Sequence, residues 1–96
     1  MSEIAENVAR HEPKHSLQLT IVNNGISKQI EIDREATVKA LLDRAIALFG
    51  NIPQPHTQSL WTEKGVELTN ENETLKAAHV KDGDTLLLRP GAVKGG

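Results

Sequence analysis

The sequence predicts an α+β fold in which one helix packs on one face of a mixed sheet of four to five strands. Three observations lead to this prediction. Apolar side chains alternate on both sides of an Asn-Asn-Gly turn, one later stretch has helical periodicity, and several short strand-like segments follow it. One helix covers only one face of a sheet, so two layers are expected. A chain of 96 residues suffices for one domain.

The first two expected strands form a hairpin. Apolar side chains occupy every second position from Leu17 to Ile21, the period of a half-buried strand. Asparagine and glycine at 23–25 accept the positive φ angles of a tight turn. The alternation then resumes over 26–32, with Ile26, Ile30 and Ile32 on one face.

The period changes from two to 3.6 after residue 33, which predicts a helix. Thr37 is a good N-cap residue, and Gly50 stands where a C′ glycine ends a helix. Lys39 and Asp43 lie four positions apart on the polar side. The apolar stripe that faces the sheet consists of Val38, Leu41, Leu42, Ala45, Ile46 and Phe49.

The remaining elements are short. Strands are expected at 59–62 and 66–68 around a turn at 63–65, and 70–78 is expected to be a loop with a single helical turn. A second turn at 81–84 leads to a last strand at 85–89. Leu86 and Leu88 should face inward, which places Leu87 and Arg89 outside. The expected organisation is a flexible extension at 1–16, a folded domain at 17–89 and a flexible tail at 90–96 that ends in Gly-Gly.

Hairpin, helix, short strands and last strand in this order form the β-grasp arrangement. Over residues 17–96 the chain resembles ubiquitin and its relatives, because several segments match that family in order and spacing. The matching segments are Leu17-Gln18-Leu19, Ala36-Thr37-Val38, Gly50-Asn51-Ile52-Pro53, Gln58-Ser59-Leu60-Trp61, Thr74-Leu75, Asp84-Thr85-Leu86-Leu87-Leu88 and Lys94-Gly95-Gly96.

The chain also departs from the family pattern. Its first turn is shorter and lacks the family's exposed leucine, and Arg89 stands where ubiquitin has an apolar residue. The tail is one residue longer and includes Pro90 and Gly91. These differences indicate a distant relative, similar to the bacterial ubiquitin-like proteins that occur with their own enzymes.

The resemblance implies a protein modifier that is conjugated through the carboxylate of Gly96, with Gly95 before it and Lys94 as a charge contact of the tail. It implies four kinds of partner: an ATP-dependent activating (adenylating) enzyme, a conjugating enzyme, a deconjugating protease and the lysines of target proteins. The bland alternative is that Gly-Gly is an unstructured tail or a remnant of expression.

A partner-binding surface is expected on the open face of the sheet. Trp61 is the single tryptophan and follows the inward-facing Leu60, so its side chain should point outward. Leu87 and Arg89 should lie beside it, with the guanidinium over the indole. Alternatively, Trp61 turns inward and caps the core.

Two other functions stay open. A sulfur carrier for cofactor synthesis also uses a β-grasp domain that ends in Gly-Gly, and there the carboxylate becomes a thiocarboxylate. A non-covalent ubiquitin-like interaction domain would need the Trp61 surface but not the terminal glycines.

Composition limits the remaining classes of function. The absence of cysteine excludes a disulfide scaffold, a thiol nucleophile and a cysteine metal site. No basic stripe predicts nucleic-acid binding, and no stretch approaches the ~20 apolar residues of a membrane span. His11 and His15 have metal-binding spacing, but Pro13 lies between them. We therefore expect a cytoplasmic monomer that is not an enzyme and that binds neither metal nor cofactor.

Overall fold

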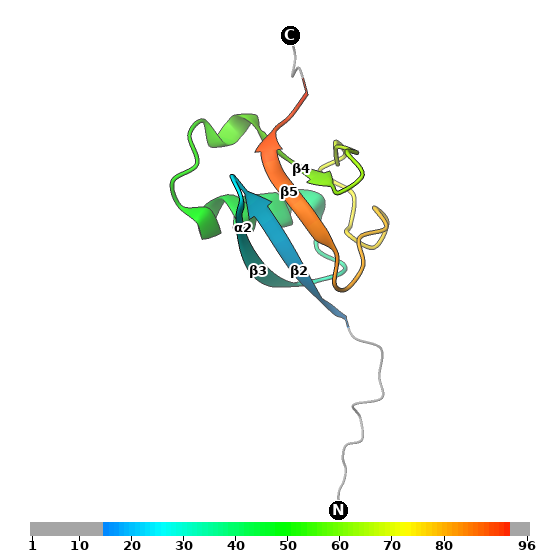
Figure 1. Cartoon of the computed structure of the whole chain (residues 1–96). Coiled ribbons are helices and arrows are strands. Elements are labelled where there is room, and N and C mark those ends of the chain that lie inside the picture. Colours follow the sequence, from blue (N-terminus) through cyan, green and yellow to red (C-terminus); the bar gives the residue numbers. More distant parts are fainter. Residues whose placement is uncertain (1–14, 93–96) are drawn as a thin grey trace, which may run out of the picture.

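A computed structural model of the chain describes residues 15–92. Within them, the predicted order of hairpin, helix, short strand and last strand is confirmed (Figure 1). The four strands form one sheet in the order β3-β2-β5-β4. The elements are β2 (Ser16–Asn23), β3 (Ile26–Asp33), α2 (Val38–Phe49), the 3₁₀ turn η2 (Pro55–Thr57), β4 (Gln58–Thr62) and β5 (Thr85–Pro90).

The hairpin of β2 and β3 is paired along its whole length, from Ser16 opposite Asp33 to Asn23 opposite Ile26. Asn24 and Gly25 have φ angles of 51° and 78°, which is the requirement of a two-residue type I′ turn. The inward side chains of β2, as predicted, are buried: Leu17, Leu19 and Ile21.

The inner face of β3 is buried over only part of its length. Ile30 and Ile32 belong to the core, but Ile26 is 55% exposed although it shares their face. Lys28 takes the inward position between Ile26 and Ile30, and its Nζ lies 5.4 Å from the centroid of the Phe49 ring. The same nitrogen donates to the carbonyl oxygen of Leu48 at 3.3 Å. The turn end of the hairpin therefore contacts the C-terminal end of α2 through the ammonium group of Lys28 and not through apolar packing of Ile26.

Helix α2 begins and ends as its sequence predicts. The hydroxyl of Thr37 accepts from the Ala40 amide at 3.1 Å, and Gly50, with φ 81°, donates its N–H to the Ile46 carbonyl. Lys39 and Asp43 form the expected exposed ion pair at 3.6 Å, worth about 0.3 kcal/mol. The buried stripe of α2 consists of Val38, Leu41, Leu42 and Ala45.

The second half of the chain completes the sheet. Strand β5 runs parallel to β2, with Ile21 opposite Leu86, and β4 runs antiparallel to β5. Parallel neighbours need a crossover connection, and the segment that contains α2 supplies it across one face of the sheet (Figure 1). Leu60, Leu86 and Leu88 enter the same core as the helix stripe. Within residues 15–92, no helix has the length and apolar content to cross a membrane.

Several boundaries differ from the prediction, and β3 and β4 are each one residue longer than expected, ending at Asp33 and beginning at Gln58. Residues 66–68 do not form a strand, because their ladder to β4 consists of one bridge, Trp61 to Glu67, with two flanking hydrogen bonds. Strand β2 begins one residue earlier than expected, at Ser16. Strand β5 continues to Pro90, which stands opposite Gln58. The single helical turn expected in 70–78 is present as a hydrogen bond from the Ala78 amide to the Thr74 carbonyl.

Candidate functional site

The outer face of β4 and β5, on the side away from α2, brings the predicted surface residues together. Leu60 is fully buried on the inner face, so the next residue, Trp61, lies on the outer face. Trp61 stands directly opposite Leu87, and Arg89 is displaced by two positions along β5. These diagonal positions are within reach of long side chains. We call the surface formed by Trp61, Leu87 and Arg89 the Trp61 patch.

Arg89 lies on the indole of Trp61. Its Cζ is 4.3 Å from the ring centroid, which is the geometry of a cation–π contact. Arg89 is exposed, so the contact is worth about 0.5–1 kcal/mol. Trp61 is half-buried, and its Nε1 is buried with no hydrogen-bond partner among the described residues. The alternative in which Trp61 turns inward to cap the core is therefore not what the structure shows.

A carboxylate beside the Trp61 patch holds the segment that follows β5. Glu67 stands opposite Trp61 and accepts a hydrogen bond from the Ser59 hydroxyl at 2.6 Å. Its other oxygen accepts from the backbone amide of Ala92 at 3.2 Å. The Gly91 amide donates to the carbonyl of Thr57 at 2.9 Å. The backbone therefore stays attached to the β4 side of the sheet for two residues after Pro90, where the sequence predicts a free tail.

Glu67 and Ser59 are not among the site residues expected from the sequence, although the strand pattern contains a signal for them. A turn at 63–65 that joins β4 to a returning segment pairs position 61 with position 67. Ser59 lies two positions before Trp61 and therefore on the same outer face of β4. It is nevertheless only 2% exposed, because Glu67 lies against it within hydrogen-bonding distance. The expected pairing of 66–68 with β4 therefore already places Glu67 opposite Trp61.

We expect Glu67→Ala to loosen the segment after β5. The substitution removes the acceptor of the Ala92 amide and leaves a buried hydroxyl at Ser59 unpaired, which should cost about 1–2 kcal/mol of folding free energy. The ¹⁵N heteronuclear NOE of Ala92 should fall at the same time. Glu63→Ala, on the exposed turn nearby, is the matched control and should change neither quantity. An unchanged Ala92 NOE in Glu67→Ala would contradict this role.

The other predicted functional residues, Lys94, Gly95 and Gly96, lie outside the described residues. Among residues 15–92, no group of three or more histidine, aspartate or glutamate side chains is placed to hold a metal ion.

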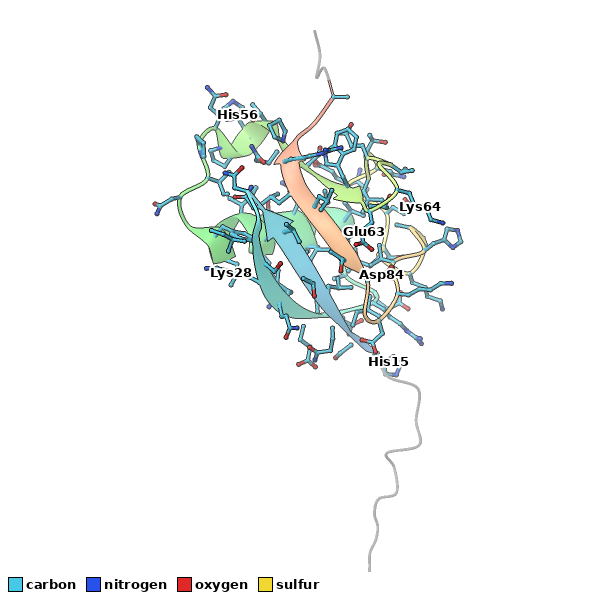
Figure 2. All side chains as sticks on the ribbon, viewed as in Figure 1. His15, Lys28, His56, Glu63, Lys64 and Asp84 are labelled. Atoms are coloured by element: carbon cyan, nitrogen blue, oxygen red, sulfur yellow. The ribbon has the colours of Figure 1, made fainter. Side chains whose placement is uncertain are left out.

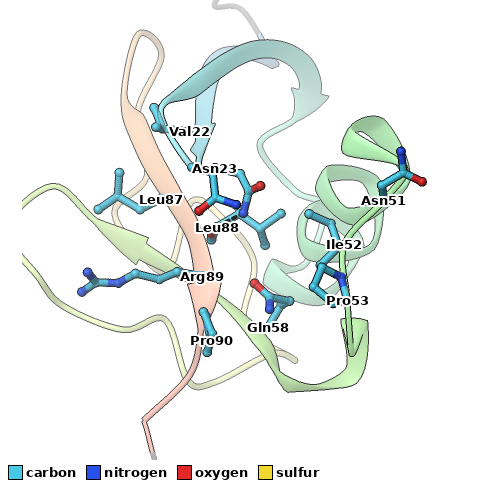
Figure 3. Close-up of a pocket in the computed structure, with 11 residues that line it drawn as sticks. Val22, Asn23, Asn51, Ile52, Pro53, Gln58, Leu87, Leu88, Arg89 and Pro90 are labelled. Carbon is cyan, nitrogen blue, oxygen red and sulfur yellow. Dashed lines mark hydrogen bonds between the residues drawn. The ribbon is translucent and has the colours of Figure 1, made fainter.

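A pocket of about 440 Å³ lies on the other side of β5 (Figure 3). In this view the side chains of Leu87 and Arg89 point to one side of β5, and Ile52, Pro53 and Gln58 lie on the other side. Among the lining residues within 15–92, Arg89 is the single ionisable one, so these residues offer no pair of groups for acid–base catalysis. Apart from Arg89, the lining consists of apolar and amide side chains: Val22, Asn23, Asn24, Asn51, Ile52, Pro53, Gln58, Leu87, Leu88 and Pro90.

Solved structures with this arrangement are ubiquitin-like. Ubiquitin of Caldiarchaeum subterraneum is 30% identical and superposes with a TM-score of 0.67, over 83% of this chain and 99% of that one. The ubiquitin-like domain of yeast Ddi1 is 23% identical, with a TM-score of 0.67 over 88% and 100% of the two chains. The ubiquitin-like domain of Arabidopsis thaliana protein At2g32350 is 19% identical, with a TM-score of 0.68 over 97% and 95%.

No curated protein matches the chain by sequence. A family model described as "Protein of Unknown function (DUF2604)" matches residues 11–96. The four-stranded mixed sheet with one helix and the likeness to ubiquitin and to ubiquitin-like domains agree with each other. The chain is therefore a ubiquitin-like β-grasp protein and belongs to the DUF2604 family.

Proposed function

We propose that the chain is a protein modifier, activated at the carboxylate of Gly96 by an ATP-dependent adenylating enzyme and then joined to amines of target proteins. The observation that carries the proposal is the ubiquitin-like domain, 30% identical to an archaeal ubiquitin over nearly all of that chain, followed six positions after β5 by Gly96. A conjugating enzyme and a deconjugating protease complete the set of partners.

The chemistry assigns distinct tasks to the chain and to its enzymes. A carboxylate is a poor acyl donor until one of its oxygens is joined to AMP, with release of pyrophosphate. The chain contains no cysteine, so the thiol that displaces AMP must belong to an enzyme. A lysine amine of the target then displaces that thiol and forms an amide bond. Gly95 and Gly96 lack Cβ atoms, which suits them to a narrow channel, and Lys94 supplies a cation to its mouth.

A second candidate function is a non-covalent ubiquitin-like interaction domain. The observation that favours it is the Trp61 patch, which lies entirely within the domain and needs no terminal residue. Tryptophan and arginine are the residue types most enriched among interface hot spots. The unpaired Nε1 of Trp61 would gain a partner if an acceptor of the bound protein reached it. In the modifier proposal the same patch receives the enzymes, so the two functions share this surface.

Trp61→Ala is expected to weaken recognition by the cognate activating enzyme. Loss of the indole and of its contact with Arg89 should raise the KM for this chain about tenfold or more, while kcat changes less. Ile26→Ala removes another exposed apolar side chain, on β3 at the opposite edge of the sheet from β4, and serves as the control. Steady-state kinetics of thioester formation test this prediction. Equal KM values for the two variants would show that the activating enzyme does not recognise the Trp61 patch.

The modifier proposal is tested by incubating the chain with ATP and its cognate adenylating enzyme. The expected product is a thioester between Gly96 and an enzyme thiol, which mild alkali hydrolyses to the free thiol and the Gly96 carboxylate. Mass spectrometry of the released chain distinguishes a free carboxylate from a thiocarboxylate, the product expected of a sulfur carrier. A terminus that stays unreactive with the cognate enzyme would favour the non-covalent domain.

A further inference from the structure

A cationic pocket lies at the opposite end of the sheet from Pro90. It has a volume of about 320 Å³ and lies between the start of β2 and the loop before β5, near the end where His15 and Asp84 are labelled in Figure 2. Of the residues that the structure describes, Arg34, Lys76 and Lys81 line it with three positive charges, and Asp82 is the one carboxylate. These four side chains therefore give the lining a net charge of +2, three positive charges less one negative. The other lining residues are Ser16, Leu17, His79 and Val80.

The carboxylate of Asp82 already has a structural partner. Its Oδ1 accepts from the backbone amide of Gln18 at 2.7 Å, and the next residue, Gly83, donates to the Gln18 carbonyl at 2.8 Å. Asp82 thus ties the loop to β2. Among residues 15–92, no carboxylate forms an ion pair with Arg34, Lys76 or Lys81, since the ion pair found there joins Lys39 and Asp43.

Arg34 is held in place by its backbone and has an unsatisfied donor in its side chain. Its amide donates to the His15 carbonyl at 2.7 Å, and its carbonyl accepts from the Lys76 amide at 3.0 Å. Its Nε is buried and has no hydrogen-bond partner among the described residues. A buried unpaired N–H is costly, and an anion that reached it would satisfy it with a charge-assisted hydrogen bond.

His79 occupies a backbone position that favours glycine. Its φ is 65°, in the left-handed region. The Val80 amide donates to the Leu75 carbonyl and the His79 amide to the Lys76 carbonyl, the two hydrogen bonds of a Schellman motif with His79 at C′. Glycine adopts this conformation without the steric penalty of a Cβ. The chain nevertheless has an imidazole here, at the rim of the cationic pocket.

We propose that this pocket binds a phosphate group, carried by a phosphorylated residue of a partner protein or present as free phosphate. A phosphate monoester has a charge of about −1.5 to −2 at pH 7 and three acceptor oxygens. Its negative charge balances the net charge of +2 of the pocket lining, and its oxygens can accept hydrogen bonds from the donors of Arg34, Lys76 and Lys81. A single carboxylate would leave most of these donors unpaired. The site is independent of the Trp61 patch and of Gly96.

The test titrates the ¹⁵N-labelled full chain at constant ionic strength, with inorganic phosphate in one series and a short phosphoserine peptide in the other. Saturable shifts confined to the amides of the pocket are expected in at least one series. Tighter binding of the peptide assigns the group to a phosphorylated partner, and equal or tighter binding of inorganic phosphate assigns it to the free ion. Both results support the site.

Three variants make the test specific. Lys76→Gln should weaken binding about tenfold, whereas the same change outside the pocket, Lys39→Gln, should alter it less than about twofold. His79→Gly should weaken binding while the melting temperature stays the same or rises, because glycine relieves the positive φ. This variant separates a binding role of the imidazole from a folding defect.

Three outcomes would overturn the proposal. The first is shifts that spread over all surface lysines without saturation. The second is equal weakening by Lys76→Gln and Lys39→Gln. The third is that a peptide with glutamate in place of phosphoserine binds as tightly as the phosphoserine peptide, which would make this a carboxylate site instead.

Discussion

Deleting Gly96 is expected to abolish activation of the chain. The deletion moves the terminal carboxylate back by one residue, about 3.5 Å along an extended backbone. An adenylating site reacts only with a carboxylate held close to its attack geometry, and a displacement of about 1 Å already costs roughly 100-fold in rate. Thioester formation should therefore fall by at least about 100-fold, measured as the rate at which a thiol-sensitive adduct of the enzyme appears.

The control for this deletion is a change in the same segment that keeps the terminal carboxylate in place. Val93→Ala meets this condition and should react at close to the rate of the unmodified chain. The melting temperatures of both variants should equal that of the parent, because the described core of the domain is built from residues 17–88. A normal rate after deletion of Gly96 would show that its carboxylate is not the group activated.

Leu41→Ala is expected to have the largest effect on stability. Leu41 is the fourth residue of α2, is fully buried, and belongs to the core shared by the helix and all four strands. Truncation of a buried leucine costs about 2–5 kcal/mol. A domain of this size is stable by only about 5–15 kcal/mol, so the urea midpoint should fall steeply. Unfolding followed by far-UV circular dichroism measures the change.

The same substitution elsewhere on α2 provides the control. Leu48 is 38% exposed, so Leu48→Ala removes the same atoms with a smaller loss of buried area than Leu41→Ala and should cost less than about 1 kcal/mol. Comparable losses for Leu41→Ala and Leu48→Ala would mean that the buried face of α2 is assigned wrongly.

The local elements of this fold are predictable from the sequence because their determinants are local. The turn at Asn24 and Gly25 needs positive φ angles that these two residue types accept. The ends of α2 follow from a threonine N-cap and a C′ glycine. Trp61 and Arg89 meet on the outer face because the side-chain period of a strand is two, and the register of β4 against β5 then brings them together.

Features that depend on the assembled domain are harder to predict. Alternation puts Ile26 on the inner face, but its burial depends on how far α2 reaches along the hairpin. The attachment of Ala92 to Glu67 joins residues 25 positions apart and leaves no periodic trace. The cationic pocket gathers Arg34, Lys76 and Lys81 from distant segments. The pairing of β2 with β3 brings Arg34 to this end of the sheet, a backbone hydrogen bond joins Lys76 to Arg34, and the parallel pairing of β2 with β5 brings the loop that carries Lys81.

Conjugation of Gly96 to amines of other proteins is measured by mass spectrometry of tryptic peptides from cells that produce the tagged chain. Trypsin cleaves after Lys94 and leaves Gly95-Gly96 on each modified lysine. If Gly96 is conjugated, lysine peptides with this two-glycine branch are expected, and they disappear when Gly96 is deleted. A thiocarboxylate at Gly96 without any branched peptide would contradict conjugation.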